Sequence, residues 1–413
     1  MEKLTIVNGD IYTPTYFGQG NIVIQDGKIS IITKENLPPS EEEIDATGCY
    51  VIPGLIDGLI HGGGGLDSMT GKIVDIETIT RAHAAHGVTS LVVGISSGSM
   101  EQINASLTAI AHVVDQPVED GARIIGSYVE GKFGSLEKNG AQNAKYITPP
   151  NFEEFHAMWA ASDGTLKVIS VAPENDENLQ FIRHLDSFKS EAYNDIVIAM
   201  GHTNATYQQA MDAFDAGITR VTHAFNGMSG MHHRDLGALE AVFAYPNIHA
   251  ELIVDEHHVH PFWGKQLINH KGIKGVGLIT DCTEHAGISP EEWQEDAVYV
   301  SELDAYRINR EADSESQRYI RDGALWLDVG EPTERLGGAI ITLMDGVRNV
   351  MGWGYSLEES LTMATLTPAQ NLGIDDSIGS IAPDKGADIV IVDEDLNVQN
   401  VILRGKVMKS HNM

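Results

Sequence analysis

The sequence predicts an α/β protein with a (β/α)8 barrel of the TIM type and a small β-sandwich domain formed by both termini. Two observations support this prediction. Apolar, β-branched segments alternate with helical patterns through the middle of the chain, and further strand-like segments lie at both ends. A length of 413 residues suits one large barrel plus a small accessory domain.

Both ends of the chain are rich in short β-type segments, and Asp26-Gly27 is a hairpin turn signal between two of them. The segments are Leu4–Val7, Asn21–Gln25, Lys28–Thr33, Ile389–Val392 and Val398–Leu403. We therefore predict that residues 1–52 and 375–413 together build the β-sandwich, and that residues 53–374 form the barrel.

The middle of the chain contains eight segments of the kind expected for buried parallel strands. They are Tyr50–Ile56, Thr89–Gly94, Arg123–Val129, Leu166–Ala172, Ile196–Met200, Ile218–Thr222, His249–Val254 and Val276–Thr280. Helical patterns separate them, and the final helix is predicted at Gly338–Met351. A doubly wound open sheet is the alternative, which fits eight units less well. The long acidic segment 284–336 is a lid, an oligomer contact or a decorated loop.

The charge of the chain excludes several functions. Lys plus Arg number 27 against 59 for Asp plus Glu, a formal net charge of −32, so the chain should repel nucleic acid and anionic membrane surfaces. Its two cysteines, Cys49 and Cys282, rule out a disulfide scaffold and a four-cysteine zinc site. The first residues resemble no signal peptide, and no apolar stretch approaches about 18 residues. We expect a cytoplasmic protein.

Ionisable residues gather where the predicted strands end. Asp57 and His61 follow the first, Glu130 the third, His202 the fifth, His223 the sixth, Asp255, His257, His258 and His260 the seventh, and Asp281 the eighth. In a parallel barrel these points share the carboxyl-terminal face, where active sites are built. A single histidine at a strand end is more often structural than a ligand, but unrelated structural needs would not readily fill six of eight strand ends.

Imidazole and carboxylate groups in this arrangement suit a divalent metal, most often zinc. Glu130, His202 and His223 are the candidate ligands, and three ligands with an open position are typical of a catalytic site. Asp281 is the candidate general base, because a carboxylate near the metal can take a proton from water and return it to a leaving amine. Asp57 is either a ligand or a brace for the first turn.

Several segments are similar to those of N-acetylglucosamine-6-phosphate deacetylases, members of the amidohydrolase superfamily. They are VIPGLIDGLIHG (51–62), VEGKFGSLEKNGAQN (129–143), VAPE (171–174), GHTNATYQQAMDAFDAGITRVTHAFNGMSGMHHR (201–234), DEHHVHP (255–261), LITD (278–281) and GSIAPDKGADIVIVD (379–393). The resemblance spans nearly the whole chain, and the 201–234 block is its most specific part.

The resemblance implies roles that agree with the strand-end pattern. Glu130, His202 and His223 match the positions that bind the catalytic metal, and Asp281 matches the general base and acid. The residues that match contacts to the sugar phosphate are Asn226, the backbone of Gly227, Arg234 and His258. Arg234 is expected to reach the neighbouring subunit's site, which implies a homodimer, and its guanidinium suits a phosphate.

Two departures from the family pattern bear on the chemistry. Leu59 replaces the first residue of the His-x-His pair that many amidohydrolases carry, so one metal ion per subunit is favoured and a ligand role for His61 is left open. Gln142 stands where the family usually has a histidine that polarises the acetyl carbonyl, so we assign Gln142 to substrate binding and catalysis. Losing an oxyanion donor costs about 10²–10³ in rate elsewhere. Lys132 stands at a position where members of the family often have proline.

The sequence thus predicts a metal-dependent hydrolase that converts N-acetylglucosamine 6-phosphate to glucosamine 6-phosphate and acetate. Zinc is the expected metal, with iron, manganese and cobalt as alternatives. The rival activities are deacetylation of another amino-sugar phosphate, such as N-acetylgalactosamine 6-phosphate, and hydrolysis of N-acyl amino acids or cyclic amides. A non-catalytic sugar-phosphate-binding protein is suggested by Leu59 and Gln142, but the retained ligands and Asp281 argue against it.

Overall fold

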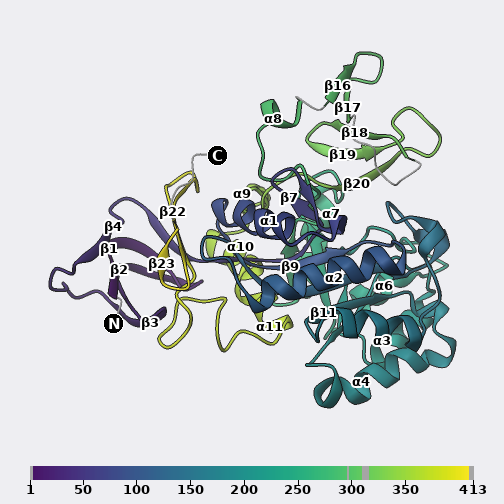
Figure 1. The fold of residues 1–413 in the computed structure, drawn as a ribbon, viewed down its shortest axis with the longest axis horizontal. Helices are drawn as coiled ribbons and strands as arrows, with labels where there is room; N and C mark the ends of the chain where they lie inside the picture. The colour runs from purple at the N-terminus through teal and green to yellow at the C-terminus, as the bar shows by residue number, and fades with distance from the viewer. Residues whose placement is uncertain (1–2, 295–296, 309–315, 409–413) are drawn as a thin grey trace.

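The two ends of the chain form one mixed sheet, at the left of Figure 1 in purple and yellow. The computed structural model describes residues 3–294, 297–308 and 316–408. The strands are β1 (Lys3–Tyr12), β2 (Tyr16–Gln25), β3 (Lys28–Thr33), β4 (Glu42–Asp45), β5 (Tyr50–Pro53), β21 (Ile389–Val392), β22 (Val398–Leu403) and β23 (Lys406–Val407). Antiparallel pairing of β5 with β21 joins the two ends, and the sheet has its own apolar core.

The middle of the chain forms a parallel eight-stranded barrel, as predicted. Its strands are β6 (Leu55–Ile60), β9 (Val88–Ile95), β10 (Arg123–Phe133), β11 (Leu166–Val171), β12 (Val197–Met200), β13 (Arg220–Val221), β14 (His249–Ile253) and β15 (Val276–Ile279). Each pairs with the next in chain order, and β6 meets the end of β15. There the Asp281 N–H donates to the Leu59 carbonyl at 3.0 Å and the His61 N–H to the Cys282 carbonyl at 2.7 Å. The domain boundaries at residues 52/53 and 374/375 stay predictions.

The first barrel strand was predicted wrongly. Residues 50–56 do not form one barrel strand, because Tyr50–Pro53 belongs to the terminal sheet and the barrel begins at Leu55. Gly54 separates them, and a Cβ at that position would lie 2.1 Å from Thr89 Oγ1, so glycine is required where the chain crosses from one sheet to the other. The residues on both sides are buried and apolar, which hides the junction from pattern analysis.

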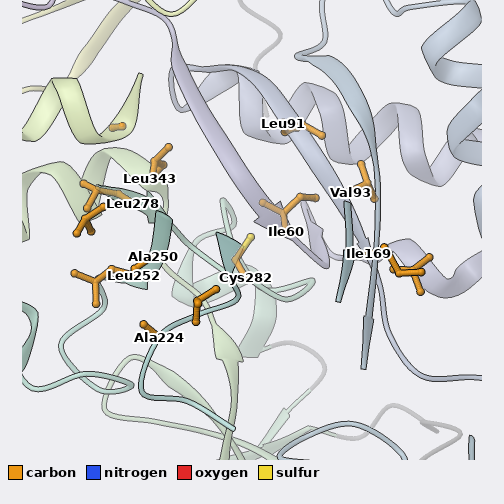
Figure 2. Close-up of a cluster of buried hydrophobic side chains, with 14 of the residues drawn as sticks. Ile60, Leu91, Val93, Ile169, Ala224, Ala250, Leu252, Leu278, Cys282 and Leu343 are labelled. Carbon is orange, nitrogen blue, oxygen red and sulfur yellow. The ribbon is translucent and has the colours of Figure 1, made fainter. Parts of the chain in front are cut away.

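Helices cover the outside of the barrel, and their contacts with the strands form the largest core. They are α1 (Ile73–Ala85), α2 (Met100–Asp115), α3 (Phe152–Ala161), α4 (Gln180–Ala192), α5 (Tyr207–Ala216), α6 (Ala238–Ala244), α7 (Pro261–Lys271), α9 (Leu343–Gly352) and α10 (Leu357–Ala364). Figure 2 shows part of this core, where Leu91 and Val93 of β9, Leu278 of β15 and Leu343 of α9 are buried. A further helix, α11 (Leu366–Asn371), contributes Ala369 to a separate apolar cluster with Ile56 and Leu59 of β6. No helix within the described ranges is long and apolar enough to cross a membrane.

The last helix also differs from the prediction of Gly338–Met351. Gly338 lies in a strand, and α9 begins at Leu343 because Thr342 caps it, accepting from the Asp345 N–H while the Asp345 carboxylate accepts from Thr342. Two more helices, α10 and α11, then follow before the chain returns to the terminal sheet.

The acidic segment after the barrel contains a separate antiparallel sheet of five strands, drawn in green at the top of Figure 1. After α8 (Pro290–Gln294) come β16 (Ala297–Val300), β17 (Ala305–Ile308), β18 (Arg318–Arg321), β19 (Ala324–Leu327) and β20 (Arg335–Ala339). We call β16–β20 the upper sheet. Arg335 Nε donates to the Gly140 carbonyl at 2.9 Å, and Arg318 Nη1 donates to Glu284 Oε1 at 2.6 Å. These contacts tie the upper sheet to the carboxyl-terminal face of the barrel.

Candidate active site

Three buried side chains converge at the carboxyl ends of the barrel strands. Glu130 Oε1 lies 2.6 Å from His202 Nε2 and 2.8 Å from His223 Nε2. His202 follows β12 and His223 follows β13, with positive φ angles of 45° and 30°. Such backbone strain in non-glycine residues is concentrated at functional sites. The three ligand-type atoms lie within 4.8 Å of one another.

An irregularity in β10 aims Glu130 into the barrel mouth. Val129 pairs with Ile169 but Phe133 pairs with Val171, so four steps along β10 oppose two along β11. Gly131, at the centre of this bulge, has a φ of 75°. Bulges re-aim side chains next to active sites, and here the bulge turns the Glu130 carboxylate towards His202 and His223.

His61 and Asp281 complete the cluster. His61 Nε2 lies 2.7 Å from Glu130 Oε2 and 3.3 Å from Asp281 Oδ1, and Ser96 Oγ lies 3.1 Å from His61 Nδ1. His61, Glu130 and Asp281 form a second group with the ligand atoms close together. Asp281, with a φ of 51°, is therefore beside the cluster, as a general base requires.

The donor set fits a divalent metal ion. Two imidazole nitrogens and a carboxylate are ligands that zinc and similar ions accept. Burial alone would raise the pKa of Glu130, but hydrogen bonds from His202, His223 and His61 outweigh it and hold the pKa well below its usual range. The anionic form that a ligand needs is thus favoured. The His202 Nδ1–H donates to the Lys138 carbonyl at 2.9 Å, which aims its other nitrogen at the cluster.

Most of the predicted site residues line a single cavity of about 720 Å³. They are His61, Glu130, Gln142, His202, His223, Asn226, Gly227, His258 and Asp281. The Ser97 N–H donates to Gln142 Oε1 at 2.7 Å. Because a backbone N–H can only donate, this bond fixes the orientation of the amide and leaves Gln142 Nε2 to donate.

Two residues that are predicted to contact the phosphate, His258 and Arg234, differ from the other predicted site residues in their contacts or their location. Both ring nitrogens of His258 are engaged, Nδ1 with Asp255 Oδ2 at 2.6 Å and Nε2 with the Gly337 carbonyl of the upper sheet at 2.7 Å. Burial would lower the pKa of His258, but the bond to Asp255 raises it. Arg234 is exposed, lies 2.6 Å from His233 Nε2, and does not line the cavity of its own chain.

Sequence reasoning missed one wall of the cavity. Its additional lining residues include Asp67, Glu284, Arg318, Leu325, Leu327 and Leu336, four of them on the upper sheet. Of these residues, Glu284 lies three residues after Asp281 and Asp67 five residues after the motif at 51–62, whereas the four on the upper sheet follow no recognised motif. Asp57 is in neither group of ligand-type atoms, and its Oδ2 accepts from Thr280 Oγ1 at 2.7 Å, which links the first barrel strand to the end of the last one.

A parallel barrel whose carboxyl-terminal face holds an imidazole and carboxylate cluster is typical of metal-dependent hydrolases. The chain belongs to the amidohydrolase family, whose profile matches residues 50–408. This family depends on divalent metal ions.

The chain is similar over nearly its full length to amino-sugar phosphate deacetylases. It is 30% identical to the N-acetylglucosamine-6-phosphate deacetylase of Vibrio furnissii, covering 94% of this chain and 90% of the relative. It is 32% identical to the N-acetylgalactosamine-6-phosphate deacetylase of Escherichia coli O157:H7, covering 93% of each. Among solved structures, a mutant N-acetyl-D-glucosamine-6-phosphate deacetylase of Mycobacterium smegmatis in complex with N-acetyl-D-glucosamine 6-phosphate has a TM-score of 0.84 at 25% identity, covering 99% of this chain and 100% of that one.

Proposed function

We propose that the protein hydrolyses the acetamide of N-acetylglucosamine 6-phosphate to glucosamine 6-phosphate and acetate, in the breakdown of amino sugars. The observation that carries the proposal is the convergence of Glu130, His202 and His223 beside Asp281 in one cavity. The relatives named as deacetylases of amino-sugar phosphates support the choice of substrate.

Glu130, His202 and His223 would hold one divalent ion, and zinc is the metal we propose for this ligand set. Iron, manganese or cobalt would suit the same nitrogen and oxygen donors. When bound, such an ion lowers the pKa of water and polarises a carbonyl group. His61 lies close enough to Glu130 and Asp281 to serve as a further ligand.

Asp281 and Gln142 would carry the proton and the developing charge. The Asp281 carboxylate accepts a proton from the water that attacks the acetamide carbon, and then returns it to the departing amine nitrogen. The Gln142 Nε2–H donates to the carbonyl oxygen as it becomes negative. The bond from Ser97 holds the Gln142 amide in place before substrate arrives, so little reorganisation is needed in the transition state.

The phosphate would be bound at the Asn226 and Gly227 end of the cavity. The Asn226 amide and the Gly227 N–H are donors there, and His258 lines the same cavity. Among the described residues that line the cavity, Arg318 is the one arginine or lysine, and it is paired with Glu284. We therefore propose that Arg234 of the partner subunit provides the missing guanidinium in a homodimer. Action in the cytoplasm stays a prediction.

A mixing experiment tests the shared site. Asp281→Asn and Arg234→Ala proteins should each be weakly active as homodimers. When they are unfolded and refolded together, half of the sites in a mixed dimer combine an intact Asp281 with an intact Arg234 of the partner subunit, so activity should return. No recovery in verified mixed dimers would contradict the shared site.

Measuring acetate release from each of two sugar phosphates decides which one is the substrate. The N-acetylgalactosamine-6-phosphate deacetylase at 32% identity makes the 4-epimer the second candidate substrate. We expect kcat/KM to be higher for N-acetylglucosamine 6-phosphate, and the reverse order would assign the second activity.

A further inference from the structure

A buried lysine next to the metal-binding cluster has no role in the mechanism above. Lys132 lies two residues after Glu130 in the bulge of β10, and only 3% of it is exposed. A lysine is almost never fully buried unless its charge is paired. Its position beside a proposed metal ligand therefore needs a physical reason.

All three hydrogens of the Lys132 ammonium group have acceptors. Nζ lies 3.1 Å from the Tyr146 carbonyl, 3.0 Å from Thr148 Oγ1 and 2.8 Å from Glu154 Oε1. The Thr148 hydroxyl in turn donates to Glu154 Oε2 at 2.8 Å, and the Thr148 N–H donates to the Lys132 carbonyl at 3.0 Å. Burial would raise the pKa of Glu154, but the hydrogen bond from Lys132 and those from Asn151 and Thr148 outweigh it and lower the pKa.

These bonds fix the carboxyl-terminal end of one loop, residues 134–148, which we call the amide loop. Its beginning is held separately, by the Ser135 N–H on the His202 carbonyl at 2.7 Å and by Asn175 Nδ2 on the Gly134 carbonyl at 2.9 Å. Lys132 thus holds the end that returns from the site to α3.

Gln142 lies somewhat nearer in sequence to the end held by Lys132 than to the beginning of the loop. A 3-10 turn spans Ala144–Tyr146, where the Tyr146 N–H donates to the Asn143 carbonyl at 3.1 Å. Asn143 directly follows Gln142, so only this short turn separates the fixed Tyr146 carbonyl from the Gln142 amide. A Cβ on Gly131 would lie 2.4 Å from Gln142 Cδ, which shows how closely Gln142 packs on the bulge.

We infer that Lys132 is a positioning residue that holds the Gln142 amide against the cluster by anchoring the end of the amide loop. The inference rests on the proposed function, because Gln142 matters only if an oxyanion forms beside it. A displacement of about 1 Å at a reacting centre can lower a rate about 100-fold.

A double-mutant cycle tests the inference. Lys132→Met keeps an unbranched apolar side chain, one atom shorter than that of lysine, and removes its three donors. We expect kcat to fall about tenfold or more with KM nearly unchanged, because Gln142 acts in the transition state. In a Gln142→Leu background the same change should lower kcat by less than about twofold. Lys189→Met is the matched control, since Lys189 pairs with Asp186 at 2.8 Å on the surface of α4 and should leave kcat unchanged.

Two results would overturn the inference: an equal fall in kcat with and without Gln142, or a lower Tm with unchanged kcat. If Lys132→Met does not fold, Thr148→Val removes one acceptor of the same anchor and enters the same cycle. A crystal structure of Lys132→Met gives a readout without activity, and Gln142 should be displaced from the Ser97 N–H. If Gln142 Oε1 still lies 2.7 Å from the Ser97 nitrogen in that structure, the anchoring role of Lys132 is refuted. This readout holds even if the wild-type protein releases no acetate.

Discussion

The buried carboxyl group of Asp57 leads to a prediction of how the stability of the protein depends on pH. Its carboxyl is fully buried, Oδ2 accepts from Thr280 Oγ1 at 2.7 Å, and Oδ1 accepts from the Thr280 N–H at 3.2 Å. Burial raises the pKa of Asp57 to about 7, although the bonds from Thr280 and Leu59 oppose the rise. The substitution Asp57→Asn introduces an amide that has the shape of the neutral acid and can donate to the same hydroxyl.

The sign of the effect follows from the two pKa values. In the unfolded chain Asp57 should titrate near its ordinary pKa of 3.8. Because the folded pKa is higher, the stabilisation from Asp57 is fully present below the unfolded pKa and is lost as pH rises through about 7. The whole loss is about 4 kcal/mol, of which about 3 kcal/mol falls between pH 5 and pH 8.

Thermal unfolding of the wild type and the Asp57→Asn variant at pH 5 and pH 8 measures this difference. From pH 5 to pH 8, the Tm of Asp57→Asn minus that of the wild type should rise by about 3 °C. This value is the stability change of about 3 kcal/mol divided by the unfolding entropy of the chain, which is about 2.1 cal/mol/K per residue. Asp212→Asn on the exposed face of α5 is the control and should show no such change. A Tm difference between Asp57→Asn and the wild type that stays constant with pH would refute the reasoning.

Three further changes address the site itself. Gln142→Leu should lower kcat about 100-fold with KM nearly constant in initial-rate assays, because one oxyanion donor is lost; an unchanged kcat would remove Gln142 from the mechanism. Gly227→Ala should weaken metal binding in titrations, because its φ is 56° and its Cβ would lie 2.9 Å from His202 Nδ1. Gly230→Ala, with no atom within 4 Å of its Cβ, should bind metal normally. Arg234→Ala should raise KM about tenfold or more for the phosphorylated sugar, by loss of a charge-assisted phosphate bond, and an unchanged KM would argue against phosphate contact.

The proximity of the proposed metal ligands and the general base could be predicted from the sequence because of the way a parallel barrel is built. Residues that follow different strands share one face, so the linear positions of Glu130, His202, His223 and Asp281 translate directly into proximity. The alternation of buried strands and helices likewise predicts the barrel without any knowledge of long-range contacts.

The remaining features depend on tertiary contacts that no local pattern encodes. The upper sheet is built from short strands, and its Arg318 pairs with Glu284, which lies 34 positions earlier in the sequence. The bond between His258 and the Gly337 carbonyl spans 79 positions, so the engagement of both its ring nitrogens could not be foreseen. The crossing at Gly54 lies within a continuous apolar run and depends on distant contacts, with the Thr89 side chain and with the Asp388 carbonyl, which accepts from the Gly54 N–H at 2.9 Å.

The most direct test of the account is acetate release by the metal-loaded protein from N-acetylglucosamine 6-phosphate, with the wild type and Asp281→Asn compared at equal metal content. The account predicts one acetate per glucosamine 6-phosphate from the wild type, and turnover lower by about 10²–10⁴ in Asp281→Asn, since a positioned acid–base group contributes about that much in rate. Turnover by Asp281→Asn within a few-fold of the wild type, with metal retained in both, would contradict it.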